Sequence, residues 1–163
     1  MIHILVCLKQ VPDTAQVRIS PETGTLIREG VPSIVNPFDM HAVEEALRLR
    51  EKYGGKVTAI SMGPLQAKEA LQKALSLGVD DAFLLCDKTF AGADTWATSY
   101  ALASAVQYFS KKTPVDLVIC GKQSIDGDTA QVGPGIANRL GFTQLTCVDA
   151  VMEIDVKART IQC

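Results

Sequence analysis

The chain has 163 residues, of which 47% are hydrophobic and 21% are charged, and its formal net charge is −2 at pH 7. This size suits one domain with its own hydrophobic core, and the near-neutral charge provides no positive field for nucleic acid. No apolar run approaches the length of a membrane span, and the short apolar start is interrupted at Lys9, unlike a signal peptide. We therefore expect a single domain, residues 1–163, that lies in the cytoplasm and contacts neither nucleic acid nor membrane.

Short apolar runs alternate with amphipathic stretches along the chain. The apolar runs predict four strands, at residues 2–8, 56–61, 82–86 and 116–120. Apolar residues spaced three or four apart predict a helix after each strand. Start and stop residues bound these helices, which run from Asn36-Pro37 to Gly54-Gly55, from Gly63-Pro64 to Gly78, from the cap Asp94 to about Lys111, and from Thr129 to Leu140 before Gly141.

Two small hairpins are also expected. Residues 17–19 and 25–27 flank the turn sequence SPETG, and residues 151–156 and 160–163 flank Lys157-Ala158-Arg159. Strands that alternate with amphipathic helices are typical of βαβ units. The sequence therefore predicts an α/β fold, a doubly wound and mostly parallel sheet of the Rossmann-like, adenine-nucleotide-binding type, with a small hairpin after the first strand.

The loop GKQSIDGDTAQVGPG follows the fourth predicted strand and leads into the last helix. In doubly wound sheets, ligands bind beyond the carboxyl ends of the strands. Glycines and a helix N-terminus suit a phosphate, although the spacing matches neither a P-loop nor GxGxxG. Asp128 with Gln131 would also fit an ordinary capping box. Pro134 implies that the helix bends or that its regular part begins near Gly133-Pro134.

Three further stretches should reach the same edge, namely residues 8–13, 36–39 and 61–64. Asn36 has two interpretations. It could supply an amide for base recognition, or it could be an ordinary helix cap.

Other residues with chemical potential have simpler explanations. His41, Glu44 and Glu45 lie on the polar face of the first predicted helix, where a solvated surface explains them better than a metal site. His3 lies within the first strand and is expected to be a hydrogen-bonded core residue. No GxSxG nucleophile elbow is present.

Trp96 and Tyr100 share one face of the third predicted helix, which favours core packing over a stacking platform. The five cysteines form no CxxC pair and no cluster with zinc spacing. Cys7, Cys86 and Cys120 lie in predicted strands, where we expect small buried side chains in a reducing compartment.

Four motifs together resemble the β subunit of electron transfer flavoproteins: VCLKQVPDT, NPFDMHAVEEALRL, SMGP and GKQSIDGDTAQVGP. The resemblance covers essentially the whole chain, and the last motif is the most specific. It implies an adenine-nucleotide-type α/β fold, an obligate α subunit and a nucleotide, AMP or FAD, in the β subunit. Carried over, the nucleotide contacts are Cys7, Asn36, Pro37, Phe38, Asp39, Met62, Gly121, Lys122, Gln123, Ser124, Ile125, Asp126, Gly127, Asp128, Thr129, Ala130, Gln131 and Val132.

The resemblance favours FAD over AMP as the occupant. VPDT, GTLIREGVPSIVNP and DGDTAQVGP are more similar to the flavin-bifurcating branch, and AMP-binding members commonly carry a second acid where this chain has Gly127. Without that carboxylate, backbone amides around Gly127 to Thr129 could meet a second phosphate. Phe38 departs from the branch, whose members often carry an acid there.

The implied function is electron transport by a carrier subunit. With its α subunit it would pass electrons between flavin-dependent dehydrogenases of the acyl-CoA type, or NADH, and other acceptors, and any electron bifurcation would need that complex. Family β subunits are longer, so we expect the docking loop and C-terminal arm to be missing here. An alternative class is an ATP- or AMP-binding regulatory module of the universal-stress-protein type. An ATP-pyrophosphatase would need SGGxDS where residues 8–13 stand.

Overall fold

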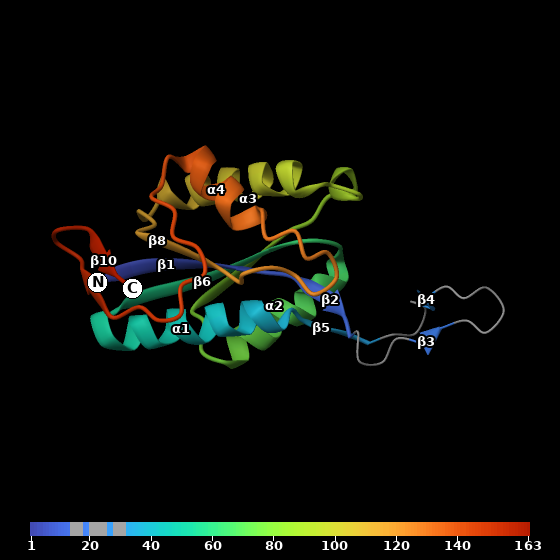
Figure 1. The fold of residues 1–163 in the computed structure, drawn as a ribbon, viewed down its shortest axis with the longest axis horizontal. Coiled ribbons are helices and arrows are strands. Elements are labelled where there is room, and N and C mark those ends of the chain that lie inside the picture. The colour runs from blue at the N-terminus through green and yellow to red at the C-terminus, as the bar shows by residue number, and fades with distance from the viewer. Residues whose placement is uncertain (14–17, 20–25, 28–31) are drawn as a thin grey trace.

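A four-stranded parallel sheet forms the centre of the molecule (Figure 1). The computed structural model describes residues 1–13, 18–19, 26–27 and 32–163. The strand order is β7-β6-β1-β8, and every neighbouring pair is parallel. These strands are β1 (Ile2–Leu8), β6 (Gly55–Met62), β7 (Asp81–Leu85) and β8 (Leu117–Cys120). The predicted doubly wound α/β fold is confirmed.

Helices cover both faces of the sheet. Figure 1 shows α1 and α2 on one face and α3 and α4 on the other. Their bounds are α1 (Pro37–Tyr53), α2 (Lys68–Ser76), α3 (Thr95–Ser110) and α4 (Val132–Leu140), with short 3-10 turns η2 (Leu65–Ala67) and η3 (Lys88–Phe90). Successive β1 side chains alternate between two cores, with Ile4 and Val6 on the α1 side and Leu5 and Cys7 on the α3 side.

Among the described residues, three short antiparallel pairs accompany the sheet. They are β2 (Gln10–Pro12) with β5 (Ser33–Val35), β3 (Arg18–Ile19) with β4 (Leu26–Ile27), and β9 (Glu153–Asp155) with β10 (Thr160–Gln162). Both predicted hairpins are confirmed in their described residues. The turn of the first, together with residues 17 and 25, lies outside the described part. The β2–β5 pair was not predicted.

Two helix starts differ from the sequence prediction. Pro64 precedes the turn η2, and α2 begins only at Lys68. The last helix begins at Val132, three residues later than predicted, with Gln131 at its cap position. Pro134 therefore lies in the first turn, where its missing N–H removes no intrahelical bond. The alternative that the regular helix begins near this proline is confirmed.

The transition from α1 to β6 depends on two glycines. Gly54 ends α1 with a φ of 68°, and Gly55 follows at 131°, where a Cβ would overlap the carbonyl oxygen of Ile2. Only glycine at position 55 lets β6 start this close to β1.

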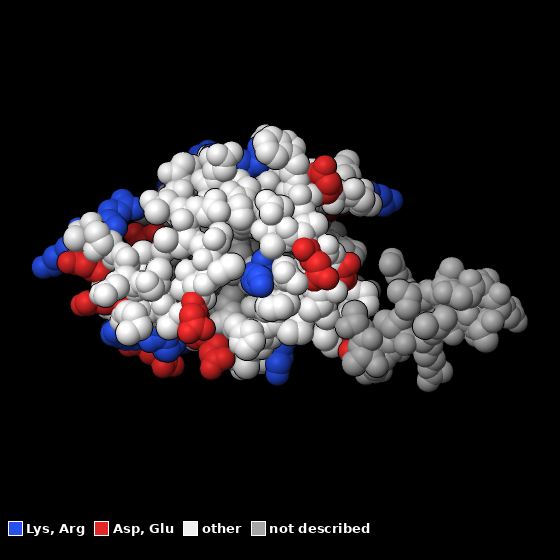
Figure 2. Space-filling view, in the orientation of Figure 1, with Lys and Arg blue, Asp and Glu red and all other residues white. Residues whose placement is uncertain are grey.

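The described residues confirm some predictions about single residues and contradict others. His3 is a buried core residue whose Nε2 lies 2.9 Å from Thr58 Oγ1, as expected. Cys7 is buried and Cys120 is partly buried, but Cys86 lies beyond the end of β7 and is exposed, so that prediction is wrong. No described helix has the length and apolar character that crossing a membrane requires. On the face seen in Figure 2, positive and negative groups are interspersed without an extended basic patch.

Candidate nucleotide site

Strands β1, β6 and β8 end together at one edge of the sheet. Leu8 pairs with Ser61, and Cys7 pairs with Cys120, the last residue of β8. The register therefore brings Cys7 and Met62 to the edge from which the loop of residues 121–131 departs. Pro37 and Phe38, at the start of α1, lie against the same edge, because a Cβ on Gly121 would meet the backbone of Phe38.

Asn36 holds the loop rather than capping its own helix. It occupies the cap position of α1 but makes no side-chain cap hydrogen bond there, so the helix-cap interpretation is wrong. The side chain is 1% exposed; its Nδ2 donates to Gln123 O at 2.8 Å, and its Oδ1 accepts from Ile125 N at 3.2 Å. Both ends of the amide face the loop, so the interpretation as a base-reading group receives no support from this geometry.

Asp39 ties the ends of two strands together. Its Oδ2 accepts from the backbone N–H of Lys9 at 2.7 Å, and the Gly121 N–H is a further donor to the carboxylate. Burial raises the pKa of Asp39 to about 6, although these hydrogen bonds and that of Asn36 favour the charged form. A Cβ on Gly121 would collide with Asp39 Oδ1, so glycine is required for this close approach.

Lys9 was not among the predicted site residues, yet it contacts the loop directly. Its Nζ lies 2.7 and 2.9 Å from the two carboxylate oxygens of Asp126 and 3.5 Å from Ser124 Oγ. Partial burial opposes ionisation of Asp126, but hydrogen bonds from Lys9 and Ser124 lower its pKa below the ordinary value. The only sequence signal for Lys9 was its place in the stretch that follows the first strand.

The middle of the loop is a tight turn. Ser124 O accepts from Gly127 N at 3.3 Å and from Asp128 N at 2.9 Å, so two of the three amides expected to meet a second phosphate are already bonded. The Asp128 carboxylate accepts from Gln123 Nε2 at 2.8 Å and does not cap α4, so the capping-box interpretation is wrong.

The end of the loop presents unbonded donors. Within the described part of the chain, the N–H groups of Thr129, Ala130 and Gln131 have no hydrogen-bond partner, and no side chain caps α4. Asp128 and Ala130 have φ values of 51° and 54°, a left-handed conformation that is unfavourable for non-glycine residues and that occurs often at functional sites.

These features fit a phosphate. Free N–H groups before an uncapped helix start, at the positive end of the helix dipole, form an anion-binding arrangement. Of the other predicted contact residues in this loop, three are exposed, namely Lys122, Gly127 and Thr129. Two are partly buried, namely Ala130 and Val132. The donor set therefore suits the phosphate part of a nucleotide.

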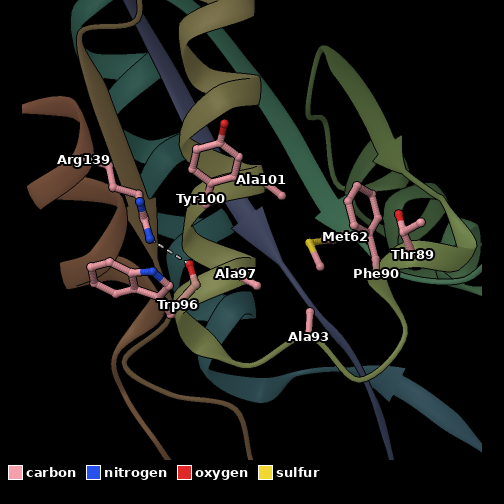
Figure 3. Close-up of a pocket in the computed structure, with 9 residues that line it drawn as sticks. All are labelled: Met62, Thr89, Phe90, Ala93, Trp96, Ala97, Tyr100, Ala101 and Arg139. Carbon is pink, nitrogen blue, oxygen red and sulfur yellow. Dashed lines mark hydrogen bonds between the residues drawn. The ribbon is translucent and has the colours of Figure 1, made fainter.

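Met62 also lines a cavity of about 380 Å³ beside this edge (Figure 3). Across it, Trp96 and Tyr100 come from α3, and Arg139 comes from α4. The Arg139 guanidinium lies 4.1 Å from the Trp96 ring centroid and donates to the Trp96 carbonyl at 3.1 Å. Trp96 and Tyr100 are 68% and 63% exposed, so the prediction that they pack in the core is wrong. No sequence pattern had pointed to Arg139.

The described part of the chain contains no group of side chains that suits a metal ion. Among the described residues, no three His, Cys, Asp or Glu side chains are grouped to hold an ion. His41 and Glu44 are exposed, and Glu45 pairs with Arg48 at 2.6 Å. The prediction that these helix residues form a solvated face is confirmed.

Comparison with known proteins decides the family. The model of the electron transfer flavoprotein domain matches residues 23–162. The chain belongs to the electron transfer flavoprotein family. It is 61% identical over 149 residues to electron transfer flavoprotein subunit beta of Thermoanaerobacterium thermosaccharolyticum, covering 91% of this chain and 56% of that protein.

Two other relatives cover similar spans. Electron transfer flavoprotein subunit beta of Clostridium acetobutylicum is 60% identical over 153 residues, which are 94% of this chain and 57% of that protein. Protein FixA of Azotobacter vinelandii is 54% identical over 160 residues, or 98% and 57%. The chain thus spans little more than half the length of the curated relatives it matches.

Proposed function

We propose that this chain is the nucleotide-binding part of an electron transfer flavoprotein β subunit and that it holds FAD, with AMP as the alternative occupant. The observation that carries the proposal is the row of unbonded N–H groups at Thr129, Ala130 and Gln131, placed directly before the uncapped start of α4. Cys7 and Met62 lie at the same edge of the sheet.

Two groups of residues have different roles in this proposal. The backbone of residues 129–131 and the first turn of α4 bind phosphate, while Cys7 and Met62 contact the remainder of the nucleotide. Asn36, Asp39 and Lys9 keep the loop in position through the contacts described above. A bound flavin supplies the electron-transfer chemistry, and the protein provides binding, orientation and electrostatics.

The larger assembly is part of the same proposal. Two relatives are named as a subunit beta, which supports pairing with an α subunit. In that complex, the protein carries electrons in the cytoplasm between flavin-dependent dehydrogenases of the acyl-CoA type, or NADH, and other acceptors. Electron bifurcation, if FAD occupies this site, requires the complete complex. The family match favours this carrier role over an ATP-binding regulatory module.

A titration tests the nucleotide site. The protein, freed of small molecules, is titrated by calorimetry with AMP, ADP, FAD and riboflavin. We expect the three phosphorylated ligands to bind and riboflavin, which lacks the adenylate, to bind much more weakly. If riboflavin binds as well as FAD, the assignment of this site to phosphate and adenosine is wrong. The mass of the molecule released on denaturation identifies the natural occupant.

A turnover assay tests the need for the partner. The chain is mixed with FAD, NADH and a flavin-linked dehydrogenase, with and without an α subunit. We expect electron transfer only when the α subunit is present. Full turnover by the isolated chain would refute the proposed division between the two subunits.

A further inference from the structure

Two cysteine side chains lie next to each other beneath the proposed nucleotide site. Cys7 on β1 and Cys120 on β8 are direct partners in the parallel register, so their side chains point to the same face of the sheet. Both pack in the core on the α3 and α4 side.

The register brings the two backbones within reach of a disulfide. Neighbouring strands lie about 4.8 Å apart, which is within the Cα separation of roughly 4.4–6.8 Å that disulfides span. A disulfide also needs a Cβ separation of roughly 3.5–4.5 Å, so the two strands must move slightly closer for the bond to close. The remaining cysteines, Cys86, Cys147 and Cys163, are all exposed. The two adjacent thiols therefore differ from the other three in having a thiol partner already in place.

The two cysteine residues differ in exposure. Cys7 is 8% exposed, whereas Cys120 is only partly buried, so we assign the first contact with a small oxidant to Cys120. The hydrogen bond with Cys120 and burial raise the pKa of the Cys7 thiol well above its ordinary value, which keeps it protonated at neutral pH.

We propose that Cys7 and Cys120 form an oxidisable dithiol that closes to a disulfide when a peroxide reaches the nucleotide site. The Cys120 thiolate attacks one oxygen of hydrogen peroxide, the O–O bond breaks, and a sulfenic acid forms with release of hydroxide, which takes up the thiol proton as water. The Cys7 sulfur then displaces the sulfenic oxygen, which leaves as a second water with the Cys7 proton. Two thiols and one peroxide give one disulfide and two waters.

The disulfide would affect the nucleotide site because Cys120 lies at the base of the loop that forms this site. Cys120 directly precedes Gly121, and its sulfur lies 3.7 Å from where a Cβ on Gly133, in the first turn of α4, would be placed. Closing the bond pulls β8 toward β1 at the base of the loop. A bound nucleotide covers the thiols and therefore slows their oxidation. This coupling rests on the proposed function.

The chemistry is tested first without nucleotide. A variant in which Cys86, Cys147 and Cys163 are replaced by serine retains only the pair and should fold normally, because the three side chains are exposed. After peroxide treatment, we expect a mass loss of two hydrogens, a cross-linked peptide pair containing Cys7 and Cys120, and reversal by dithiothreitol. If the folded variant instead proceeds to sulfinic acid at Cys120 with no cross-link, the proposal is overturned.

A matched control and a ligand arm complete the test. Cys120→Ser in the same background should show no cross-link and no mass loss, and a mass loss there would contradict the assignment. Saturating FAD should slow disulfide formation several-fold, and an unchanged rate with FAD bound would refute the coupling. If calorimetry detects neither FAD nor AMP binding while the disulfide still forms, the proposed function fails and the dithiol assignment stands.

Discussion

Replacing Gly127 by aspartate tests whether this position selects the second phosphate. Gly127 is exposed, its φ is not in the left-handed region, and a Cβ there would contact only Ser124 Oγ, at an ordinary 3.5 Å. The larger side chain therefore fits without strain. Gly127→Asp should fold as well as the parent chain, and any change in affinity then comes from the added charge.

The magnitude follows from Coulomb's law. Two unit charges about 4 Å apart at an effective dielectric of about 20 repel by about 4 kcal/mol. Because the new side chain is exposed and rotates freely, solvent and salt should reduce the penalty to roughly 1–3 kcal/mol, or about 5- to 150-fold in affinity for FAD. AMP carries one phosphate and should be weakened less, so the variant should shift the preference toward AMP.

The assay compares dissociation constants for FAD and AMP at fixed ionic strength in the parent chain, in Gly127→Asp and in Gly127→Asn. The asparagine variant has nearly the same shape without the charge, so it separates repulsion from steric effects. Equal weakening of FAD and AMP by aspartate, or equal effects of asparagine and aspartate, would show that Gly127 does not select a second phosphate. The preference for FAD would then lose its physical support.

Three further substitutions test the scaffold of the site. Because the pKa of Asp39 is raised to about 6, its contribution to stability is full below about pH 4 and falls by about 3 kcal/mol in total as the pH rises through 6 to about 7. Asp39→Asn should abolish that fall, and urea unfolding that shows the same pH dependence of the unfolding free energy in this variant as in the parent chain would contradict the prediction. Lys9→Met removes the ion pair with Asp126 and should lower nucleotide affinity several-fold while changing stability by less than about 1 kcal/mol, and calorimetry showing unchanged affinity would refute its role. Gly135→Ala places a Cβ 2.7 Å from the Ser99 side chain and should lower the unfolding free energy by about 1–3 kcal/mol. Ser99→Gly, combined with Gly135→Ala, should restore part of this loss. If the stability losses of the two single variants simply add in the double variant, the clash is refuted.

The strands and most helix ends could be predicted because their causes are local. The apolar run of β1 is buried along its whole length, and Asp94 caps α3 by accepting from Ala97 N, three residues away. Asn36 and Asp128 have the same cap-like chemistry, but their side chains bond to the loop instead. For Asn36 that partner is 87 residues distant in the sequence, which no local rule can anticipate.

Helical spacing predicted which residues share a face but not which face is covered. Trp96 and Tyr100 do lie on one side of α3, yet the helix buries Leu102, Ala103 and Val106 against the sheet and leaves the two aromatic rings exposed beside Arg139. Amphipathic patterning is weak in this helix, because small residues such as alanine and serine fit equally well on either side. The burial of its aromatic residues therefore could not be decided from the sequence.

The loop can keep its N–H groups unpaired because other parts of the chain supply the bonds that hold it. Asn36 satisfies the backbone at Gln123 and Ile125, and Lys9 fixes Asp126. The turn at Ser124 consumes two more amides, and the donors that remain are those that face the start of α4. A phosphate site of this kind is preorganised, so part of its affinity resides in residues that never touch the ligand. Residues 36–39 were expected to contact the nucleotide, and two of their side chains, Asn36 and Asp39, build the loop that would do so.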